Sequence, residues 1–324
     1  MKAIAWTKYG APEVLKLKEF EKPLPKDNEV LIKIHATSVT AGDCRLRASK
    51  APTGFWLPTR LVFGLTKPRK QISGMDISGE IESAGKNVKL FKKGDKVYGT
   101  TGMRLGANAE YTCLPENSAL VKKPDKITYE QAVATIFGSL TAIHFLRDKV
   151  NIQRGQTVLV NGASGAVGTA SIQLAKYFGA EVTGVCSASN IDLVRSIGAK
   201  KVIDYTKNDF TKNNEKYDVI LDTVGNLSLQ RCKESLTKQG KLILINTGLL
   251  VNLLSIFRKN LICGVAGESK EGLDFLRERI EAGDIEAVID RVYPLEKTSE
   301  AHRYVDIGHK KGNVIISVGH ENVY

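Results

Sequence analysis

The chain has 324 residues, of which 42% are hydrophobic and 25% charged, as in an ordinary folded globular protein with room for two domains. A formal net charge of +12 would suit an anionic cofactor, an acidic membrane surface or nucleic acid. The basic residues are spread along the chain without an RNA-binding motif, so solvated faces explain the charge and nucleic-acid binding is not expected.

The amino terminus, MKAIAWTKYG, lacks the apolar core of a signal peptide and is typical of a first β-strand. No apolar run reaches about 18 residues, so no integral membrane segment is expected. Five cysteines are widely scattered, with no CxxC pair. This pattern indicates a reduced, cytoplasmic protein.

Short strands separated by turns are predicted in the first third of the chain. Residues 29–39, 77–85 and 93–102 show mixed alternation of polar and apolar side chains, with Gly or Asp between them. This part of the chain is therefore expected to be rich in β-structure.

The pattern changes near Pro124, after which helical and apolar segments alternate at regular spacing. Predicted helices cover residues 129–146, 165–179, 190–199 and 229–239, and predicted strands cover 157–162, 181–186, 201–204, 217–225 and 241–246. Near-continuous apolar strands alternating with helices predict an α/β fold with a doubly wound parallel sheet. A helix over 272–283 and two short strands over 288–295 and 313–319 close the chain.

The strongest local motif is Ala163-x-Gly165-x-x-Gly168, directly after a predicted strand and at the start of a predicted helix. Gly165 would let the backbone approach a pyrophosphate, whose charge the helix amino terminus favours. Gly168 would let the helix pack closely on the sheet. The alternative is a tight strand-to-helix turn that binds no ligand.

The end of the next strand bears on the choice between NAD and NADP. An NAD enzyme usually carries Asp or Glu there, whereas this strand ends at Cys186 and is followed by Ser187-Ala-Ser-Asn190. Ser187 and Asn190 can donate hydrogen bonds to a 2′-phosphate, which a carboxylate would repel. We therefore predict NADP (NADPH), although both residues also suit a simple turn.

The region from the glycine motif through VIDY resembles the cofactor domain of zinc-independent medium-chain dehydrogenases/reductases, the quinone oxidoreductase-like group. ATSVTAGDCRLR, GMDISGEIESAG, KKGDKVYG and GHKKGNVIISV resemble that group's catalytic domain, so the resemblance covers essentially the whole chain. It implies a Rossmann NADP-binding domain over 125–266. It also implies a split, mainly antiparallel β (GroES-like) catalytic domain over 1–124 and 267–324.

The resemblance also implies where NADPH lies. The glycine loop and helix start would hold the phosphates, through Ala163, Ser164, Gly165, Ala166, Val167 and Gly168. Tyr205 would lie beside the 2′-phosphate with Ser187 and Asn190, and Thr141, Asn246 and Thr247 would lie near the nicotinamide. Relatives often have Lys at the position of Asn313, near the phosphates, so that contact depends on Asn313 itself or on Lys311.

Zinc-dependent members of the superfamily have a Cys and a His where this chain has Thr40 and Met75. Thr and Met are poor zinc ligands, the four-cysteine structural lobe is absent, and the histidines show no ligand spacing, so no metal is expected. Cys44 lies four residues beyond the ligand position and is expected to pack in the core.

Without a metal, a substrate carbonyl must be polarised by hydrogen bonds or not at all. Quinones and α,β-unsaturated carbonyls tolerate this because the developing charge is delocalised. Thr40 is the candidate donor and Asp43 the nearest ionisable group, although Asp43 equally suits a structural carboxylate bonded to backbone, Arg45 or Arg47. The alternatives are a zinc-free alcohol dehydrogenase or ketone reductase and a non-catalytic NADPH-binding sensor.

Two further segments carry expectations. Residues 55–70 are long, apolar and basic, and fit a loop that forms a substrate-pocket wall, a buried structural loop, an oligomer contact or a membrane-surface anchor. Residues 261–265 should form an exposed sheet edge. Relatives pair this edge across a twofold axis, which implies a homodimer.

Overall fold

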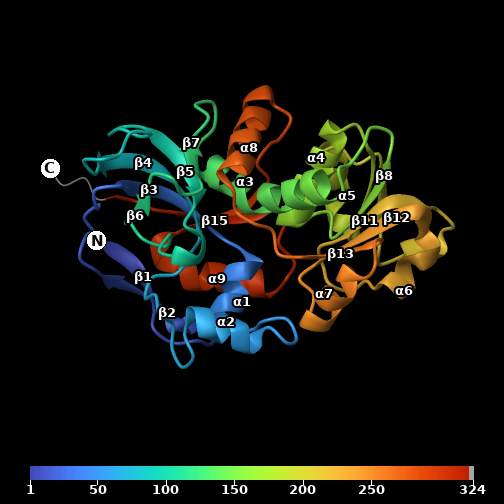
Figure 1. Ribbon diagram of the computed structural model, residues 1–324, viewed down its shortest axis with the longest axis horizontal. Coiled ribbons are helices and arrows are strands. Elements are labelled where there is room, and N and C mark those ends of the chain that lie inside the picture. Colours follow the sequence, from blue (N-terminus) through green and yellow to red (C-terminus); the bar gives the residue numbers. More distant parts are fainter. Residues whose placement is uncertain (321–324) are drawn as a thin grey trace.

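The computed structural model describes residues 1–320. A six-stranded parallel sheet lies at the centre of one half of the molecule (Figure 1). Its strands, in spatial order, are β10 (Lys201–Asp204), β9 (Glu181–Cys186), β8 (Thr157–Asn161), β11 (Tyr217–Asp222), β12 (Leu236–Ile245) and β13 (Leu261–Gly264). The order runs outward from β8 in one direction and from β11 in the other. The carboxyl ends of β8 and β11 therefore form the topological switch point at which such sheets bind ligands.

A mixed, mainly antiparallel sheet is the centre of the other half. Its strands, in order, are β14 (Ile289–Pro294), β15 (Asn313–Ser317), β3 (Glu29–Val39), β4 (Asp76–Ala84), β5 (Lys96–Thr100) and β7 (Leu120–Lys122), and β6 (Tyr111–Pro115) also pairs with β3. The strands β1 (Lys2–Trp6) and β2 (Leu15–Glu19) form a separate hairpin. β15 pairs antiparallel with β3, so both ends of the sequence build this sheet, as the split catalytic domain implies.

The nine α-helices of the described part are α1 (Ala41–Ala48), α2 (Trp56–Phe63), α3 (Tyr129–Ala142), α4 (Ala166–Tyr177), α5 (Ile191–Ser196), α6 (Leu229–Cys232), α7 (Leu249–Ile256), α8 (Lys270–Ala282) and α9 (Thr298–Asp306). α3 continues into a π-helical turn, Ile143–Lys149. Within residues 1–320 none of these helices has both the length and the apolar character needed to cross a bilayer.

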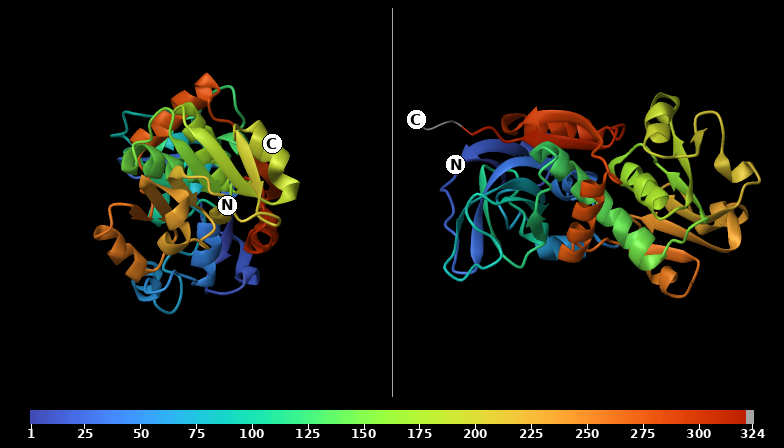
Figure 2. Two further views of the ribbon diagram at one scale, coloured as in Figure 1. Left: turned by 90° about the vertical axis from the view of Figure 1, so that its right-hand side faces the viewer. Right: turned by 90° about the horizontal axis from the view of Figure 1, so that it is seen from above.

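α3 joins the two halves. It packs on α4 beside the parallel sheet and on strands β3, β4 and β15 of the mixed sheet, and it crosses the middle of the molecule in Figure 2. A Cβ on Gly138 would lie 2.4 Å from the Ala166 carbonyl oxygen, so only glycine allows α3 to lie this close to the start of α4. The first turn of α4 is thereby fixed relative to the mixed sheet.

The predicted strands and the long helices are confirmed, with one clear error. The helix predicted over 229–239 ends at Cys232, a 3₁₀ turn covers Lys233–Ser235, and β12 begins at Leu236. Leu236 is buried in the sheet core opposite Tyr217, and this burial outweighs the helix propensity of the segment. Helices α1, α2, α7 and α9 were not predicted, and α2 lies within 55–70, which was expected to be a loop.

Candidate functional site

At the switch point, the Asn161 amide and the Asp222 carboxylate connect the ends of β8 and β11 by hydrogen bonds. The sequence analysis did not single out either residue. Asn161, at the end of β8, donates to Asp222 Oδ1 (2.9 Å) and to Asn226 Oδ1 (2.8 Å). Asp222, fully buried at the end of β11, also accepts from the backbone N–H groups of Val224, Gly225 and Leu227. These bonds fix the loops at the edge of the sheet where the cofactor motif begins. The signal in the sequence was a polar residue at the end of each apolar strand.

Among the glycines of the loop after β8, only Gly165 has room for a side-chain Cβ. Gly162 has a φ of +82°, and a Cβ there would lie 2.3 Å from Thr223 Oγ1. A Cβ on Gly168 would lie 2.2 Å from the Gly162 carbonyl oxygen, which is the close packing expected of that residue. A Cβ on Gly165 would meet only that same oxygen, at 3.6 Å. The fold itself therefore does not require glycine at 165, whereas close approach of a ligand would.

The amino end of α4 fits a phosphate group. Gly165 is its N-cap, and no side chain caps the helix. The first-turn backbone N–H groups, with the positive end of the helix dipole, are the donors that a pyrophosphate needs. Ser164 and Gly165 lie beside Gly312 from the mixed-sheet half, whose N–H donates to the Ser164 carbonyl oxygen (2.7 Å). Ala163 is fully buried and supports the loop from beneath.

At the end of the site where adenosine is expected, the structure brings Ser187, Asn190, Ser164 and Tyr205 together. The Asn190 amide donates to Ser164 Oγ (3.1 Å) and Ser187 Oγ (3.2 Å), linking the glycine loop to the end of β9. Asn190 Oδ1 is buried and lacks a hydrogen-bond partner within the described chain. Tyr205, 56% exposed, follows β10 and donates its backbone N–H to Cys186. The unpaired Asn190 Oδ1 can accept from a ribose hydroxyl, and the Ser187 hydroxyl can donate to a 2′-phosphate.

Asp204 is a carboxylate at this end that the sequence analysis overlooked, because it considered only the end of β9. It accepts from the Thr206 N–H (3.0 Å) and hydroxyl (2.8 Å), and these bonds lower its pKa, with Lys207 contributing in the same direction. Asp204 is therefore ionised at neutral pH. Its charge weakens the electrostatic case for a 2′-phosphate, and the nearby charge of Lys207 offsets it.

Lys310 is the lysine bonded beside the glycine loop. Its ammonium group donates to the carbonyl oxygen of Gly312, the residue that bonds Ser164. Burial lowers the pKa of Lys310 to about 8. Lys311 is exposed, and its backbone N–H donates to Asp290 (2.9 Å), while the buried Asn313 amide donates to the Val288 carbonyl oxygen (3.1 Å). The sequence analysis named Lys311 and Asn313 and missed Lys310.

The residues expected at the nicotinamide end lie on two elements. Asn246 directly follows β12 and has a left-handed φ of +72°, which is uncommon outside glycine. The Thr247 hydroxyl and carbonyl accept from the Asn252 amide (2.8 and 3.1 Å). The Thr141 hydroxyl, buried in α3, donates to the Phe137 carbonyl oxygen (2.8 Å). Asn246 and Thr247 thus share one loop at the carboxyl edge of the parallel sheet.

Thr40 and Asp43 are directly bonded and form the amino end of α1. The Thr40 hydroxyl donates to Asp43 Oδ2 (2.6 Å) and accepts from the Asp43 N–H (3.1 Å). The Thr40 N–H also donates to Asp43 Oδ2 (2.9 Å), which completes a reciprocal capping box. Asp43 therefore has the structural role considered in the sequence, through backbone and Thr40 rather than through an arginine. Burial raises the pKa of this carboxyl group.

Two further carboxyl groups lie within electrostatic range of Asp43. Asp76, buried in β4, accepts from the Ser38 hydroxyl (2.8 Å), and burial, reinforced by Asp43, holds its pKa well above the usual value. Burial likewise raises the pKa of Glu268, and Asp43 adds to the effect. Grouped acidic side chains with raised pKa values are typical of sites that hold or move protons. Sequence reasoning missed Glu268, because it lies more than 200 residues from Asp43 in the chain.

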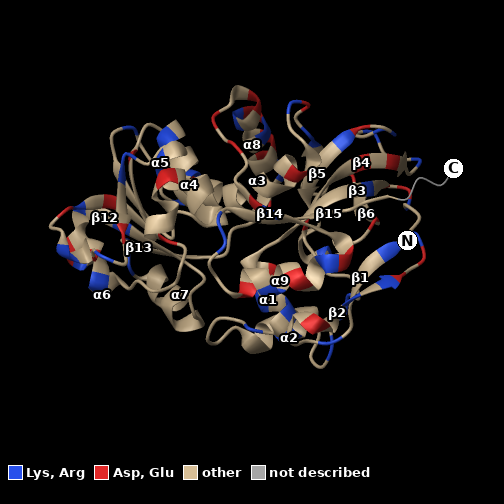
Figure 3. Ribbon diagram, turned by 180° about the vertical axis from the view of Figure 1, so that it is seen from behind, with Lys and Arg blue, Asp and Glu red and all other residues tan. Residues whose placement is uncertain are grey.

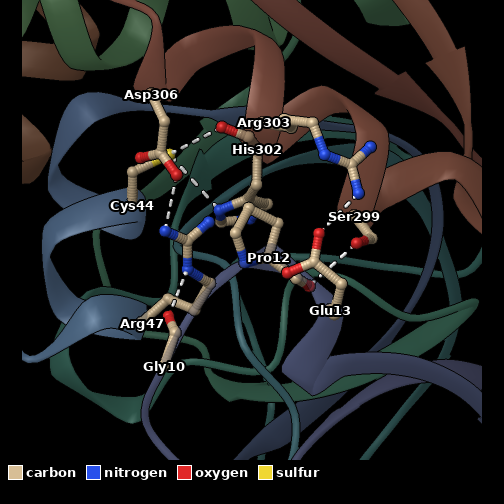
Figure 4. Close-up of polar contacts among 9 residues, drawn as sticks. All are labelled: Gly10, Pro12, Glu13, Cys44, Arg47, Ser299, His302, Arg303 and Asp306. Atoms are coloured by element: carbon tan, nitrogen blue, oxygen red, sulfur yellow. Dashed lines mark hydrogen bonds and ion pairs between the residues drawn. The ribbon is translucent and has the colours of Figure 1, made fainter.

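The amino end of α1 is held in place by α9. Cys44 Sγ lies 3.3 Å from His302 Nδ1, and the Arg47 guanidinium bonds Asp306 (2.6 Å) and the Gly10 carbonyl oxygen (3.1 Å), as Figure 4 shows. Cys44 is buried, as predicted. His302 is fully buried, and this burial lowers its pKa to about 3, so the ring stays neutral at physiological pH. The contact positions Thr40 and Asp43 through the helix that carries them.

At the two zinc-ligand positions of the superfamily, the chain has Thr40 and Met75. Across residues 1–320, no group of three or more His, Cys, Asp or Glu side chains is arranged to hold a metal ion. Asp43, Asp76 and Glu268 are bonded instead to hydroxyl groups. The donors present suit hydrogen bonding and proton exchange.

Comparison with known proteins identifies the family. Residues 26–125 match the family described as "Alcohol dehydrogenase GroES-like domain", and residues 197–316 match "Zinc-binding dehydrogenase". The chain is 30% identical to a quinone oxidoreductase of Homo sapiens over 322 residues, covering 94% of each protein. It is 32% identical to the 2-methylene-furan-3-one reductase of Solanum lycopersicum, covering 98% of this chain and 79% of that one.

Among solved structures, the quinone oxidoreductase from Coxiella burnetii is similar over 98% of this chain and 99% of that one, with a TM-score of 0.86 and 27% identity. The match extends over both sheets. The chain therefore belongs to the quinone oxidoreductase-like group of the medium-chain dehydrogenase/reductase family, and it is an oxidoreductase that uses a nicotinamide cofactor.

Proposed function

We propose that the protein uses NADPH to reduce quinones or α,β-unsaturated carbonyl compounds without zinc. The observation that carries this proposal is the Thr40–Asp43 pair, in which a hydroxyl hydrogen-bonded to a buried carboxyl group occupies a position where zinc enzymes have a cysteine ligand. The names of two relatives, a quinone oxidoreductase and a 2-methylene-furan-3-one reductase, support the same substrate classes.

NADPH would lie along the carboxyl edge of the parallel sheet. The pyrophosphate would bind the first turn of α4 (Ser164–Gly168) with Lys310 beside it, and the 2′-phosphate would bind Ser187, Asn190 and Tyr205. Thr141, Asn246 and Thr247 would border the nicotinamide, which supplies the hydride. Asn313, whose amide donates to the Val288 carbonyl oxygen, would lie near the phosphates.

In the proposed reaction, the Thr40 hydroxyl protonates the substrate oxygen. Hydride arrives at the conjugated carbon, or at the quinone, and electron density moves to that oxygen. In this step the Thr40–Asp43 hydrogen bond reverses: Thr40 gives its proton to the substrate and takes one from Asp43 in its protonated form. Burial favours that form because it raises the pKa of Asp43. Water then reprotonates Asp43. The Asp43 N–H, bonded to Thr40 Oγ1, stabilises charge on that oxygen during the transfer.

A substrate panel tests this proposal. The protein should oxidise NADPH with quinones and enones much faster than with matched saturated ketones, because a saturated ketone concentrates charge on one oxygen. Preference for the saturated ketone would indicate a zinc-free ketone reductase. Nucleotide binding without turnover of any acceptor would indicate an NADPH sensor.

We also propose a homodimer, with 125–266 as the Rossmann domain and 1–124 with 267–324 as the catalytic domain. β13 is the terminal strand of the parallel sheet, and an unpaired edge of this kind needs covering. Light scattering at micromolar concentration would contradict the dimer if it gave the monomer mass. All five cysteines are free, which supports a reducing compartment such as the cytoplasm.

A further inference from the structure

Helix α2 turns its apolar face outward. Leu57, Leu61 and Val62 are all exposed, together with Pro58, and at about 100° per residue they lie on one side of the helix. No residue of α2 is fully buried. The outward face therefore consists entirely of apolar side chains, which reverses the usual arrangement of a surface helix.

The side of α2 that faces the protein carries Phe63 and Arg60. Phe63 packs against the core of the mixed-sheet half. The Arg60 guanidinium lies 3.8 Å from the centre of the Tyr9 ring and 5.5 Å from that of Trp56. Its Nε and Nη1 atoms are buried and find no hydrogen-bond acceptor among residues 1–320. The helix thus presents an apolar surface with a positive charge directly beneath it.

The surrounding sequence carries only one sign of charge. Residues 44–75 contain no Asp or Glu. Lys67, Arg69 and Lys70, which follow α2, are all exposed. A second copy of the chain docking symmetrically through this stretch would bring its like charges together, and neither stretch would supply an acidic residue to pair them. An anionic lipid surface would instead supply both the apolar phase and the opposite charge.

From this arrangement we infer that α2 and the basic stretch after it form a docking surface for an anionic membrane. Leu57, Leu61 and Val62 enter the interface between headgroups and acyl chains, and Lys67, Arg69 and Lys70 contact the headgroups. Trp56, at the first position of α2, lies at the water boundary, where indole rings are favoured.

The surface adjoins the predicted nicotinamide end. The Thr53 carbonyl oxygen, just before α2, accepts from the Leu249 N–H (2.8 Å), and α7 starts two residues beyond Thr247. α7 also exposes only apolar side chains and is tan throughout in Figure 3. Docking through α2 would place the site beside the bilayer, where lipophilic quinones partition. This last point rests on the proposed function, whereas membrane docking itself does not.

The chain contains its own reporter for the test. Of its two tryptophans, Trp56 is 52% exposed and Trp6 is 1% exposed, so lipid contact should change only the emission of Trp56. The full chain would be titrated with phosphatidylcholine vesicles with and without phosphatidylglycerol. We expect a blue shift with the anionic vesicles, quenching by brominated acyl chains, and loss of both signals in Trp56→Phe.

Cosedimentation with the same vesicles then assigns the binding to α2. Leu57→Gln combined with Leu61→Gln should weaken binding by about tenfold, because it removes two apolar side chains that the bilayer would bury. Lys67→Gln with Arg69→Gln should reduce binding to anionic vesicles and its salt dependence. Leu24→Gln, at a residue that is 84% exposed on another surface, is the matched control and should change nothing.

Three results would overturn the inference. One is equal binding of wild type and the double leucine variant. Another is absence of binding to either vesicle under low salt. The third is a change from dimer to monomer in the leucine variant without vesicles, which would mean that a second copy covers α2. NADPH binding, measured on every variant, checks that each variant is folded. This check does not depend on which reaction the protein catalyses.

Discussion

Lys310 offers a pH-dependent test of the cofactor site. Its ammonium group donates to the carbonyl oxygen of Gly312, and the Gly312 N–H in turn donates to Ser164 of the glycine loop. Burial lowers the pKa of Lys310 to about 8. We predict that Lys310→Gln weakens NADPH and NADH to a similar extent. Both nucleotides carry the pyrophosphate that this charge would neutralise.

The magnitude follows from the charge and the pKa. A hydrogen bond from a charged donor contributes about 1.5–3 kcal/mol, so the substitution should raise Kd by about tenfold to a hundredfold. In the wild type, the ammonium form is nearly complete at pH 7 and about one tenth of the population at pH 9, given a pKa of about 8. Affinity should therefore fall about tenfold over that interval, and in Lys310→Gln it should stay nearly constant.

Fluorescence titration of both nucleotides at several pH values measures this directly. Lys311→Gln is the matched control, since Lys311 is adjacent and exposed but donates only its backbone N–H to Asp290. The reasoning is refuted if Lys310→Gln leaves affinity unchanged. It is also refuted if Lys311→Gln has the larger effect.

Three further outcomes are expected. Ser187→Asp should weaken NADPH by at least about tenfold and leave NADH nearly unchanged, because a carboxylate repels only the 2′-phosphate; parallel losses in both titrations would contradict this. His302 has a folded pKa of about 3 against 6.5, so its contribution to stability is complete above pH 6.5 and is lost as the pH falls, at about 1.4 kcal/mol per pH unit. Denaturant unfolding between pH 7 and pH 5 should show a free energy of unfolding that falls more steeply in the wild type than in His302→Gln, and the difference between the two slopes should approach that value below pH 6.5. Elemental analysis should find no stoichiometric zinc, since Thr40 and Met75 occupy two ligand positions, and one zinc per chain would be decisive against it.

The parts of the fold with strong periodicity could be predicted from sequence. The parallel strands β8 to β13 contain short apolar runs, and Gly165 and Gly168 occur in a strand–turn–helix context that has few interpretations. The helices α2 and α7 escaped prediction because their outward faces are apolar. The periodicity rule assigns the apolar face of a helix to the core, so it does not identify helices whose apolar face is exposed.

The site was predictable only where it is local in sequence. The family resemblance indicated Thr40, and Asp43 was the nearest ionisable residue in the same segment; the structure joins them in one capping box. Glu268, and the Cys44–His302 contact that fixes α1, depend on how distant parts of the chain pack. Whether Lys310 or Lys311 lies beside the glycine loop depends on the direction in which the turn before β15 points each side chain. Two adjacent lysines in a sequence do not indicate that direction.

The central claim is that the Thr40 hydroxyl, without a metal, protonates a conjugated acceptor during hydride transfer from NADPH. The most direct test is kcat/KM for an enone and its saturated ketone, in the wild type and in Thr40→Val. We predict that the enone is strongly preferred, and that Thr40→Val lowers kcat by about a hundredfold while leaving NADPH affinity nearly unchanged. A saturated ketone that reacts faster would contradict the proposed reaction, and an unaffected kcat in Thr40→Val would contradict the role of this hydroxyl.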